Sequence, residues 1–349
     1  MKDISIIIPM FNGRNYIKRN VNELLKIHHS KEIIIIDDGS SDDSYDFCLR
    51  EWKNHPDIKL IQQCNSGIVK TRNVGLQEAT SKYVIFVDQD DMVVSDVIDS
   101  SIDRMIKENC QMGIWSTDFL AENGGRKKCD QVYENAIVFN EEVINSVLVP
   151  VLTNNSTKYC TYIGHVWACI FELKLIKDNN ILFKKFIDYE DDYLFVVDAL
   201  ANTNSCMFIV ETGYFWSINY NSYSHTKKYL KNYLMKSENL EKYIMEVAQN
   251  SSLNNGDIEK IEAYWRQSTI IKAIRNAGSC QNVDWKEVDL VKKRMKTEKY
   301  RNAFRITLLL ENDSRYKILF WLLRVKLYSG AALLVNIYYN YYCKKIVKR

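Results

Sequence analysis

The stretch that decides the fold reads EIIIIDDGSSDDS, residues 32–44. Its four consecutive isoleucines, Ile33–Ile36, are typical of a strand buried on both faces, like the inner strands of a parallel sheet. The run stops abruptly at Asp37 and Asp38, and Gly39 then gives the chain the freedom to turn tightly. In open α/β sheets, ligands bind beyond the carboxyl ends of the strands, so this acidic turn marks a candidate site.

Regular patterns continue on both sides of this stretch. Short apolar runs typical of strands occupy Ile4–Pro9, Lys59–Gln62 and Tyr83–Val87. Helical spacing covers four segments with clear bounds, Asn15–Ile27, Gly67–Gln77, Ser95–Lys107 and Tyr193–Leu200. A further helix is expected to start after Ser41. Strands that alternate with helices predict an α/β fold with a Rossmann-like, doubly wound sheet. The chain from Thr226 onward contains no proline and has mostly helical patterns, which predicts a helical C-terminal extension.

A second acidic turn follows the strand-like run Tyr83–Val87 and reads FVDQDD over residues 86–91. Carboxylates crowded into one turn repel one another, so a fold keeps them where a cation or hydrogen-bond donors compensate the charge. Hard oxygen ligands of this kind suit Mg²⁺ or Mn²⁺, which commonly bind through one or two carboxylates and substrate phosphates. The alternative is a solvated turn whose aspartates cap the helix that begins at Ser95.

Three further polar clusters have both a functional and a structural interpretation. The acidic turn at residues 37–42 could accept hydrogen bonds from a base or a ribose hydroxyl, or it could be an ordinary loop with a helix cap. The basic side chains of Lys70 and Arg72 could reach phosphate or form a solvated helix face. The four acids within residues 188–192 could include a general base for a sugar hydroxyl, or they could simply favour a helix N-terminus.

Taken in order, these clusters resemble the motifs of family 2 glycosyltransferases with the GT-A fold. The matching stretches are ISIIIPMFNG (4–13), EIIIIDDGSSDDS (32–44), NSGIVKTRNVGL (65–76), YVIFVDQDD (83–91), GHVWACIF (164–171) and EDDYLF (190–195). The resemblance covers residues 4–225 and implies a GT-A sheet. It implies a nucleotide-sugar-binding half over residues 1–110 and an acceptor-binding and catalytic-base half over 111–225. The helical, basic extension over 226–349 lies outside the resemblance.

The resemblance implies a nucleotide pocket formed by the first motifs. Phe11 would pack on the nucleobase, and Pro9 would flank that pocket. Asp38 would hold the base, usually uracil, and Arg72 would lie near it. The donor implied by these residues is a UDP-sugar.

The same resemblance assigns the second acidic turn to the donor diphosphate. Asp88, Gln89 and Asp90 match the Asp-x-Asp motif of the family, and Asp91 adds a common fourth position. Asp88, Asp90 and Asp91 would hold Mn²⁺ or Mg²⁺, while Asp88 and Gln89 would also line the nucleotide-sugar site.

Asp191 matches the general base of the family, with Glu190 beside it. Deprotonation of an acceptor hydroxyl in a single displacement would invert the anomeric centre. The implied function is an inverting transferase that moves a sugar from a UDP-sugar to a saccharide acceptor, lipid-linked, in bacterial O-antigen or capsule synthesis. The chain departs from many relatives at Cys169, where they have a lysine two residues after the tryptophan of the acceptor segment.

Other classes of function stay open at this stage. A nucleotidyltransferase would use a similar sheet, but such enzymes tend to carry a glycine-rich phosphate loop near the N-terminus, which this sequence lacks. A non-catalytic nucleotide-sugar-binding protein is the second alternative, although the acidic turn and Asp191 are both present. No nucleic-acid partner is expected, because the body of the chain is acidic and no recognition module is visible.

Charge is distributed unevenly along the chain. The net charge is +3, yet residues 290–349 carry fifteen Lys and Arg against three Asp and Glu, so the remainder carries −9. Within this basic part, Arg315–Arg349 has apolar runs interrupted by charges, which predicts contact with an anionic membrane surface rather than a spanning helix. The alternative is that these apolar residues pack as helices against the catalytic body. Because the N-terminus shows no signal-peptide pattern, we expect a cytoplasmic protein, peripheral on the inner face of the membrane.

Overall fold

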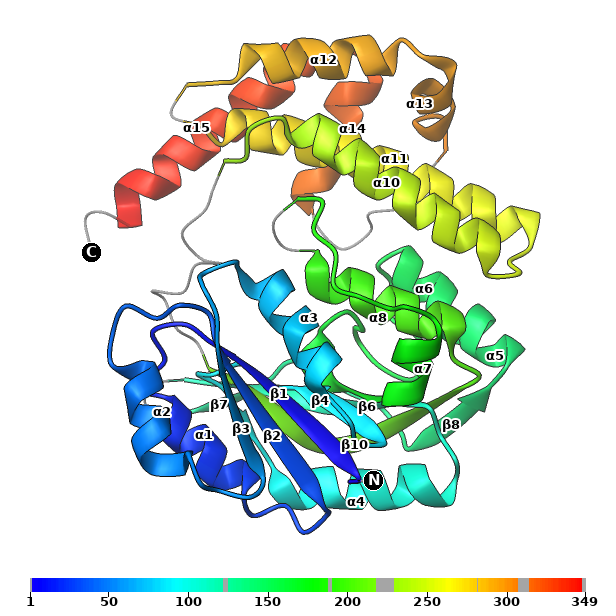
Figure 1. Cartoon of the computed structure of the whole chain (residues 1–349). Helices are drawn as coiled ribbons and strands as arrows, with labels where there is room; N and C mark the ends of the chain where they lie inside the picture. Colours follow the sequence, from blue (N-terminus) through cyan, green and yellow to red (C-terminus); the bar gives the residue numbers. More distant parts are fainter. Residues whose placement is uncertain are drawn as a thin grey trace. The chain divides into compact units, whose positions relative to one another are not determined.

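The computed structural model describes residues 2–121, 125–187, 190–217, 229–280, 282–306 and 314–346 (Figure 1). The chain forms two compact units. Unit 1 comprises Met1–Val151, Asn155–Lys185 and Glu190–Asn219, and unit 2 comprises Leu152–Asn154, Phe186–Tyr189 and Tyr220–Arg349. Most of residues 1–225 therefore lies in unit 1, and residues 226–349 lie in unit 2.

Unit 1 is built on a ten-stranded sheet with the order β3-β2-β1-β4-β9-β6-β10-β5. Its parallel half consists of β3 (Ile58–Gln62), β2 (Lys31–Asp37), β1 (Ile4–Met10) and β4 (Tyr83–Phe86). The other half consists of β9 (Cys169–Glu172), β6 (Met112–Leu120), β10 (Ser205–Ser217) and β5 (Met92–Val93). Two short strands, β7 (Arg126–Lys128) and β8 (Ala136–Phe139), pair with β6 and β10. Burial of the isoleucines of β1 and β2 on both faces explains why their sequence is continuously apolar.

Helices cover both faces of this sheet. The connections use α1 (Ile17–Leu24), α2 (Ser44–Trp52), α3 (Ile68–Glu78) and α4 (Ser95–Lys107), and two later helices are α7 (Leu173–Asp178) and α8 (Asp191–Asn202). Figure 1 shows α3, α7 and α8 on one face, with α1 and α4 on the other. The predicted α/β fold with a doubly wound sheet is thus confirmed, and α4 has the predicted bounds.

Close packing fixes α3 on the sheet. A Cβ atom added at Gly75 would lie 2.4 Å from Cγ2 of Ile7 on β1, so only glycine allows this approach. Four buried aromatic rings pack against one another where α8 meets the sheet, some edge-to-face and some stacked. They are Phe86, Phe171, Phe183 and Phe195. This packing makes α3, β4 and α8 a rigid base for the residues at their ends.

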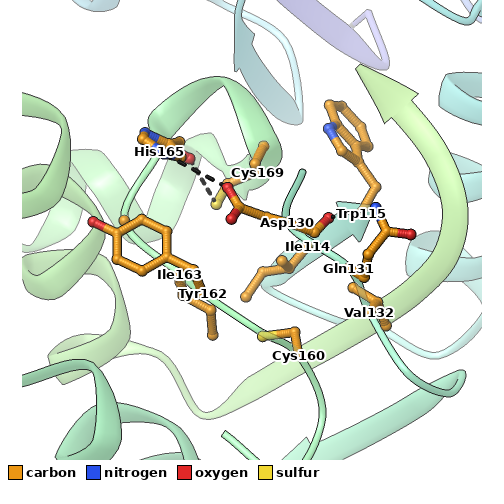
Figure 2. Close-up of a pocket in the computed structure, with 12 residues that line it drawn as sticks. Ile114, Trp115, Asp130, Gln131, Val132, Cys160, Tyr162, Ile163, His165 and Cys169 are labelled. Atoms are coloured by element: carbon orange, nitrogen blue, oxygen red, sulfur yellow. Dashed lines mark hydrogen bonds and ion pairs between the residues drawn. The ribbon is translucent and has the colours of Figure 1, made fainter. Parts of the chain in front are cut away.

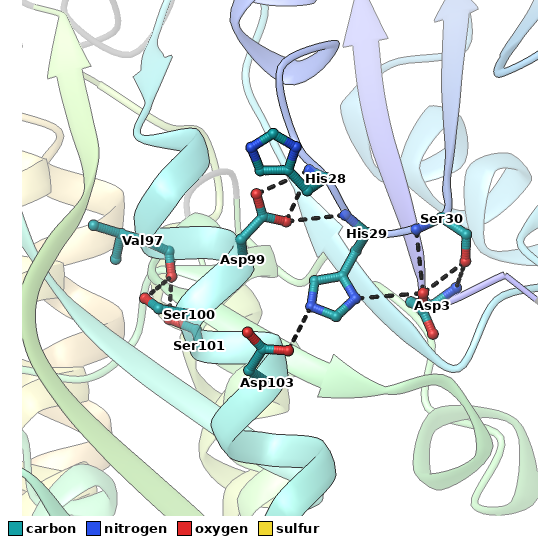
Figure 3. Close-up of polar contacts among 9 residues, drawn as sticks. All are labelled: Asp3, His28, His29, Ser30, Val97, Asp99, Ser100, Ser101 and Asp103. Atoms are coloured by element: carbon teal, nitrogen blue, oxygen red, sulfur yellow. Dashed lines mark hydrogen bonds and ion pairs between the residues drawn. The ribbon is translucent and has the colours of Figure 1, made fainter.

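A polar cluster fixes α4 against the loop before β2 (Figure 3). The carboxylate of Asp99 accepts hydrogen bonds from the backbone N–H groups of His28 and His29, at 2.9–3.1 Å. The His29 ring lies between Asp103, 3.1 Å from Nε2, and Asp3, 3.4 Å from Nδ1. These contacts join the start of β1, the loop and α4.

Unit 2 is helical, as predicted for the C-terminal extension. Its helices are α10 (Tyr233–Asn250), α11 (Asn255–Gly278), α12 (Trp285–Met295), α13 (Glu298–Ala303), α14 (Ser314–Arg324) and α15 (Tyr328–Ile346). The central helix α11 contacts all five others. Asn254 caps α11 by accepting a hydrogen bond from the Asp257 N–H, and Asp284 caps α12 in the same way. In the part of the chain that the structure describes, we find no helix with the length and apolar character needed to cross a bilayer.

Candidate active site

The loops that follow β1, β2 and β4 meet at the carboxyl edge of the parallel strands. The side-chain oxygen of Asn12 accepts hydrogen bonds from the backbone N–H groups of Ser41 (2.8 Å) and Asp42 (3.4 Å). The first two loops are thereby joined. Asn12 itself has a positive φ of 52°, a conformation that asparagine tolerates better than most residues.

Gln89 joins the first loop to the turn after β4. The Phe11 N–H donates to Gln89 Oε1 at 2.9 Å, and Gln89 Nε2 donates to the Phe11 carbonyl oxygen at 3.0 Å. Gly13 leaves room for this amide, because an added Cβ would lie 2.2 Å from Gln89 Oε1. The Phe11 ring is 45% exposed. The pair therefore holds the loop while the ring remains accessible for stacking.

Asp38 is buried and holds the loop before α3. Its Oδ1 accepts hydrogen bonds from Ser66 N–H and Gln63 Nε2, and its Oδ2 accepts one from Gly67 N–H, all at 2.8 Å. Burial alone would raise the pKa of Asp38, but these hydrogen bonds together hold that pKa below its ordinary value. Asp38 is therefore ionised at neutral pH. Pro9 lies buried in β1, opposite Ile36.

Arg72 binds three carboxylates, and that of Asp38 is not among them. Its Nη2 donates to Asp88 Oδ1 at 2.9 Å, and its Nη1 donates to Asp191 Oδ2 at 3.2 Å and to Asp192 Oδ1. The guanidinium also lies over the Phe183 ring, 5.3 Å from its centroid. One buried side chain on α3 thus joins the turn after β4 to the first turn of α8.

This cluster carries more negative than positive charge. One guanidinium faces the carboxylates of Asp88, Asp191 and Asp192, which leaves an excess of two negative charges. Burial, supported by the neighbouring Asp192 charge, raises the pKa of Asp191 to about 6 even though Arg72 acts in the opposite direction. Burial likewise raises the pKa of Asp88. A divalent cation would compensate this excess charge.

The carboxylates of the second acidic turn differ in the hydrogen bonds that their oxygens accept. Asp91 is buried, and its two oxygens accept hydrogen bonds from the Tyr214 hydroxyl (2.7 Å) and the Ser217 N–H (2.8 Å). Burial and the charges of Asp88 and Asp90 raise its pKa well above the ordinary value. The Asp90 carboxylate, by contrast, has no hydrogen-bond or ion-pair partner among the residues described. Asp88 and Asp90 thus retain oxygens that could bind a cation.

The backbone of the same turn is held by α1. Arg19 Nη2 donates to the Asp90 carbonyl oxygen at 2.9 Å, and Asn20 Nδ2 donates to that of Asp88 at 3.0 Å. Across the described ranges, no three His, Cys, Asp or Glu side chains converge into a metal-binding group. A cation here would therefore need ligands from a substrate, as is usual for Mg²⁺ with phosphates.

The predicted base lies in the first turn of α8. Asp191 opens this helix, its side chain is 12% exposed, and Glu190 precedes it at the cap position. A helix N-terminus stabilises nearby negative charge, which opposes the effect of burial. The first acid of the predicted cluster, Asp188, lies outside the described residues.

A stack of three rings lies beside the second acidic turn. Trp167 stacks on Tyr214 with a centroid separation of 4.7 Å and on His165 at 4.5 Å. The Tyr214 hydroxyl that donates to Asp91 also accepts a hydrogen bond from the Asp88 N–H at 3.1 Å. The stack is thereby fixed to the turn.

A small pocket lies beside this stack (Figure 2). His165 Nε2 lies 3.5 Å from Asp130 Oδ2, and burial raises the pKa of Asp130 although His165 lowers it. Trp115 lines the same pocket, and its Nε1 is buried without a hydrogen-bond partner in the described part of the chain. The pocket is thus lined by a carboxylate close to an imidazole and by a tryptophan with a buried indole N–H.

Residues 5–154 match the family model described as Glycosyl transferase family 2. This part of the chain is thus similar to that family. The chain resembles the uncharacterized glycosyltransferase EpsJ of Bacillus subtilis, with 27% identity over 63% of this chain and 62% of that protein. It also resembles the cholesterol galactosyltransferase of Borreliella burgdorferi, with 30% identity over 61% of this chain and 59% of that protein. The match spans less than two thirds of either relative.

The fold of this chain is also that of a solved structure. Residues 1–349 of Staphylococcus aureus TarS superpose with a TM-score of 0.68 and 20% identity, over 97% of this chain and 91% of the other. The likeness extends over the α/β sheet and the helical part. It confirms the predicted fold class.

The sequence motifs indicated the main parts of this candidate site but not several residues around them. Tyr214 binds two positions of the acidic turn, His165 stacks on Trp167, and Asp130 lies beside His165. Tyr214 lies in an aromatic run, GYFWS at residues 213–217, and this run was the only local signal of a role. Asp130 had no such signal, because its pairing with His165 depends on the fold.

Proposed function

We propose that this chain is an inverting glycosyltransferase that transfers a sugar from a UDP-sugar to a hydroxyl group of a saccharide acceptor. The observation that carries the proposal is the contact of one buried guanidinium, Arg72, with both Asp88 and Asp191. A transferase of this type needs a donor-diphosphate site and a base close together. This contact joins the two candidate groups.

Asp191 is proposed as the general base. In a single displacement, the acceptor oxygen forms a bond to the anomeric carbon while the bond from that carbon to the diphosphate oxygen breaks. The acceptor proton goes to the Asp191 carboxylate, and UDP leaves with the bonding electron pair. A pKa of about 6 leaves Asp191 mostly ionised at neutral pH but basic enough to accept the proton. Because one bond forms as the other breaks, the anomeric configuration inverts.

Asp88 and Asp90 are proposed to hold Mn²⁺ or Mg²⁺, and Asp91 to support the turn beside them or add a ligand. The available carboxylate oxygens and the excess negative charge fit a hard divalent cation. Such an ion would act as a Lewis acid that stabilises negative charge on the diphosphate. The chain's own part is to keep the turn in place through Gln89, Arg19 and Asn20.

Phe11 and Asp38 are proposed to bind the uracil base. The accessible Phe11 ring suits stacking, and Asp38 stays ionised and can accept a further hydrogen bond from a base N–H. TarS has been crystallised in complex with UDP and with UDP-GlcNAc, which supports a uridine donor. Arg72 is proposed to act on Asp88 and Asp191 rather than on the base.

The acceptor is proposed to be a lipid-linked saccharide of a bacterial surface polymer, with the enzyme peripheral to the membrane. One relative is named as a putative teichuronic acid biosynthesis glycosyltransferase, and TarS is named for a poly(ribitol-phosphate) acceptor. A third is named for transfer to cholesterol, a lipid. These names support an acceptor that belongs to a cell-surface or membrane component.

The test is a panel of UDP-sugars and GDP-sugars with purified full-length chain, Mn²⁺ and lipid-linked or free saccharides, in which nucleotide release is measured. We expect release from a UDP-sugar, a product of inverted anomeric configuration by NMR, and loss of both in Asp191→Asn. Asp178→Asn, on the exposed surface of α7, is the matched control and should keep full activity. Equal use of GDP-sugars or a retained anomeric configuration would contradict the proposal.

A further inference from the structure

One side of helix α15 packs on α11. Ala331 and Ala332 are fully buried, and the Ala332 carbonyl oxygen would lie 2.6 Å from a Cβ added at Gly278, so glycine is required for this approach. Asn336 Nδ2 donates to the Gly278 carbonyl oxygen at 3.1 Å and to that of Cys280 at 2.7 Å. These contacts fix the rotation of α15 about its axis.

The opposite side of α15 is exposed and apolar. Its exposed large side chains recur at positions i, i+1, i+4, i+5 and i+8, which share one broad helix face, and are Leu333, Leu334, Ile337, Tyr338 and Tyr341. Ile337, at the centre of this group, is 66% exposed. A surface helix ordinarily turns charged and polar residues outward, so an apolar outer face marks a surface that something else covers.

Helix α14 (Figure 1) likewise has one buried and one exposed set of apolar side chains, with basic residues beside the exposed set. Leu319, Phe320 and Leu323 are buried, whereas Ile318 and Trp321 are exposed, Trp321 by 58%. The exposed apolar residues continue into the connection to α15, at Val325 and Leu327. Lys317, Arg324 and Lys326, between and beside these residues, are exposed as well.

The charge of this region favours one occupant. Residues 314–349 contain eight Lys and Arg and no Asp or Glu. Of these basic residues, Lys317, Arg324 and Lys326 are described as exposed, and two copies of this surface would bring their like charges together, which disfavours a symmetric dimer through it. An anionic lipid surface has complementary charge and an apolar layer beneath its headgroups. Exposed Trp and Tyr side chains are also the ones that lie at the headgroup level.

We infer that the outer face of α14 and α15 docks on an anionic membrane and lies parallel to it. We call the exposed apolar residues Ile318, Trp321, Val325, Leu327, Leu333, Leu334, Ile337, Tyr338 and Tyr341 the C-terminal face. These side chains enter the boundary between headgroups and acyl chains, and the lysines and arginines contact phosphate groups. This docking would bring the enzyme to a lipid-linked acceptor, and in that respect it rests on the proposed function.

The test is co-sedimentation of the full chain with vesicles of phosphatidylcholine alone or with phosphatidylglycerol added, at low and at high salt. We expect binding to the anionic vesicles that falls at least tenfold at high salt. The variant Trp321→Ser/Ile337→Ser should lose this binding about tenfold or more. Trp285→Ser/Leu290→Ser, which changes two exposed apolar residues of α12, should bind like the unchanged chain.

Several outcomes would overturn the inference. Equal binding to neutral vesicles, no binding at all, or binding that survives alkaline carbonate would each exclude a parallel, charge-dependent contact. Dimerisation of the unchanged chain that Trp321→Ser/Ile337→Ser abolishes, without any vesicle binding, would assign the face to a second copy. Nucleotide release with a free saccharide is measured on the same variants and should be unchanged, so failure of membrane docking is distinguishable from failure of the proposed transferase activity.

Discussion

Arg72 and Asp191 are 119 positions apart in sequence, yet Arg72 Nη1 lies 3.2 Å from Asp191 Oδ2. The other terminal nitrogen of the same guanidinium binds Asp88, which follows β4. Because a guanidinium is planar and rigid, the two carboxylates are held at a fixed separation. The relative position of the candidate base and the candidate donor-diphosphate turn therefore depends on one side chain.

Replacement of Asp191 by Asn should separate catalysis from donor binding. The amide keeps the shape of the carboxylate but cannot accept the acceptor proton, so turnover should fall by about 10²-fold or more. Binding of UDP with Mn²⁺, measured by calorimetric titration, should stay within about twofold. If Glu190→Gln abolishes turnover while Asp191→Asn retains it, the base is assigned to the wrong neighbour.

The rate should depend on pH through Asp191. Its pKa is raised to about 6, and only the ionised form acts as a base, so kcat should fall as the pH drops through 6. The fall should approach tenfold per pH unit below 5. The measurement is kcat from pH 4.5 to 8 with saturating donor and acceptor, with the folded fraction checked by circular dichroism. A flat profile down to pH 5 would show that the ionisation of Asp191 does not limit the rate.

Replacement of Arg72 by Met should destabilise unit 1. Loss of the guanidinium leaves Asp88, Asp191 and Asp192 close together without a positive partner, and removal of one member of a buried ion pair costs about 3–5 kcal/mol. Carboxylates whose folded pKa is raised bind protons more readily in the folded state, so the deficit should shrink as the pH falls from 8 to 5. Urea unfolding of the variant and of the unchanged chain at pH 8 and pH 5 measures this deficit in the free energy of unfolding.

The matched control for Arg72→Met is Lys70→Met on the same helix. Lys70 is exposed, and its replacement should change the free energy of unfolding by less than about 0.5 kcal/mol. A deficit of Arg72→Met that grows at low pH would contradict the charge argument.

The sequence was informative about local structure and much less so about these contacts. Apolar runs such as Ile33–Ile36 predicted the strands because burial on both faces excludes polar residues from them. The partners of Arg72 could not be predicted, since its surroundings in sequence suggest only a solvated helix face or a phosphate ligand. The hydrogen bonds between Gln89 and the Phe11 backbone also depend on folding, because they join loops 78 positions apart.

The pairing of Gln89 with Phe11 predicts a role in donor binding. Gln89→Glu keeps an acceptor for the Phe11 N–H but places a carboxylate oxygen against the Phe11 carbonyl oxygen. Loss of this hydrogen bond and the new repulsion should raise KM for the UDP-sugar about tenfold, with a smaller effect on kcat. Gln77→Glu on the exposed side of α3 is the control. An unchanged KM would show that the loop keeps its place without this pair.

Transfer should require a divalent cation at the second acidic turn. EDTA should abolish transfer, and Mn²⁺ or Mg²⁺ should restore it. Asp90→Ala should weaken activation by Mn²⁺ at least tenfold, because Asp90 is the acid of this turn whose carboxylate is engaged by no described residue. Asp91→Asn should instead lower the melting temperature, since its carboxylate accepts hydrogen bonds from Tyr214 and Ser217.

These two variants separate metal binding from support of the turn. Binding of Mn²⁺ in the presence of UDP, followed by electron paramagnetic resonance, gives a readout that does not depend on turnover. We expect Asp90→Ala to lose bound Mn²⁺ while it melts like the unchanged chain, and Asp91→Asn to melt earlier while it retains Mn²⁺. Full activity in EDTA would refute the need for a cation. If Asp91→Asn loses bound Mn²⁺ at a temperature where this variant is folded, Asp91 is a metal ligand. Its carboxylate oxygens would then have to release their hydrogen bonds with Tyr214 and Ser217 in order to bind the ion.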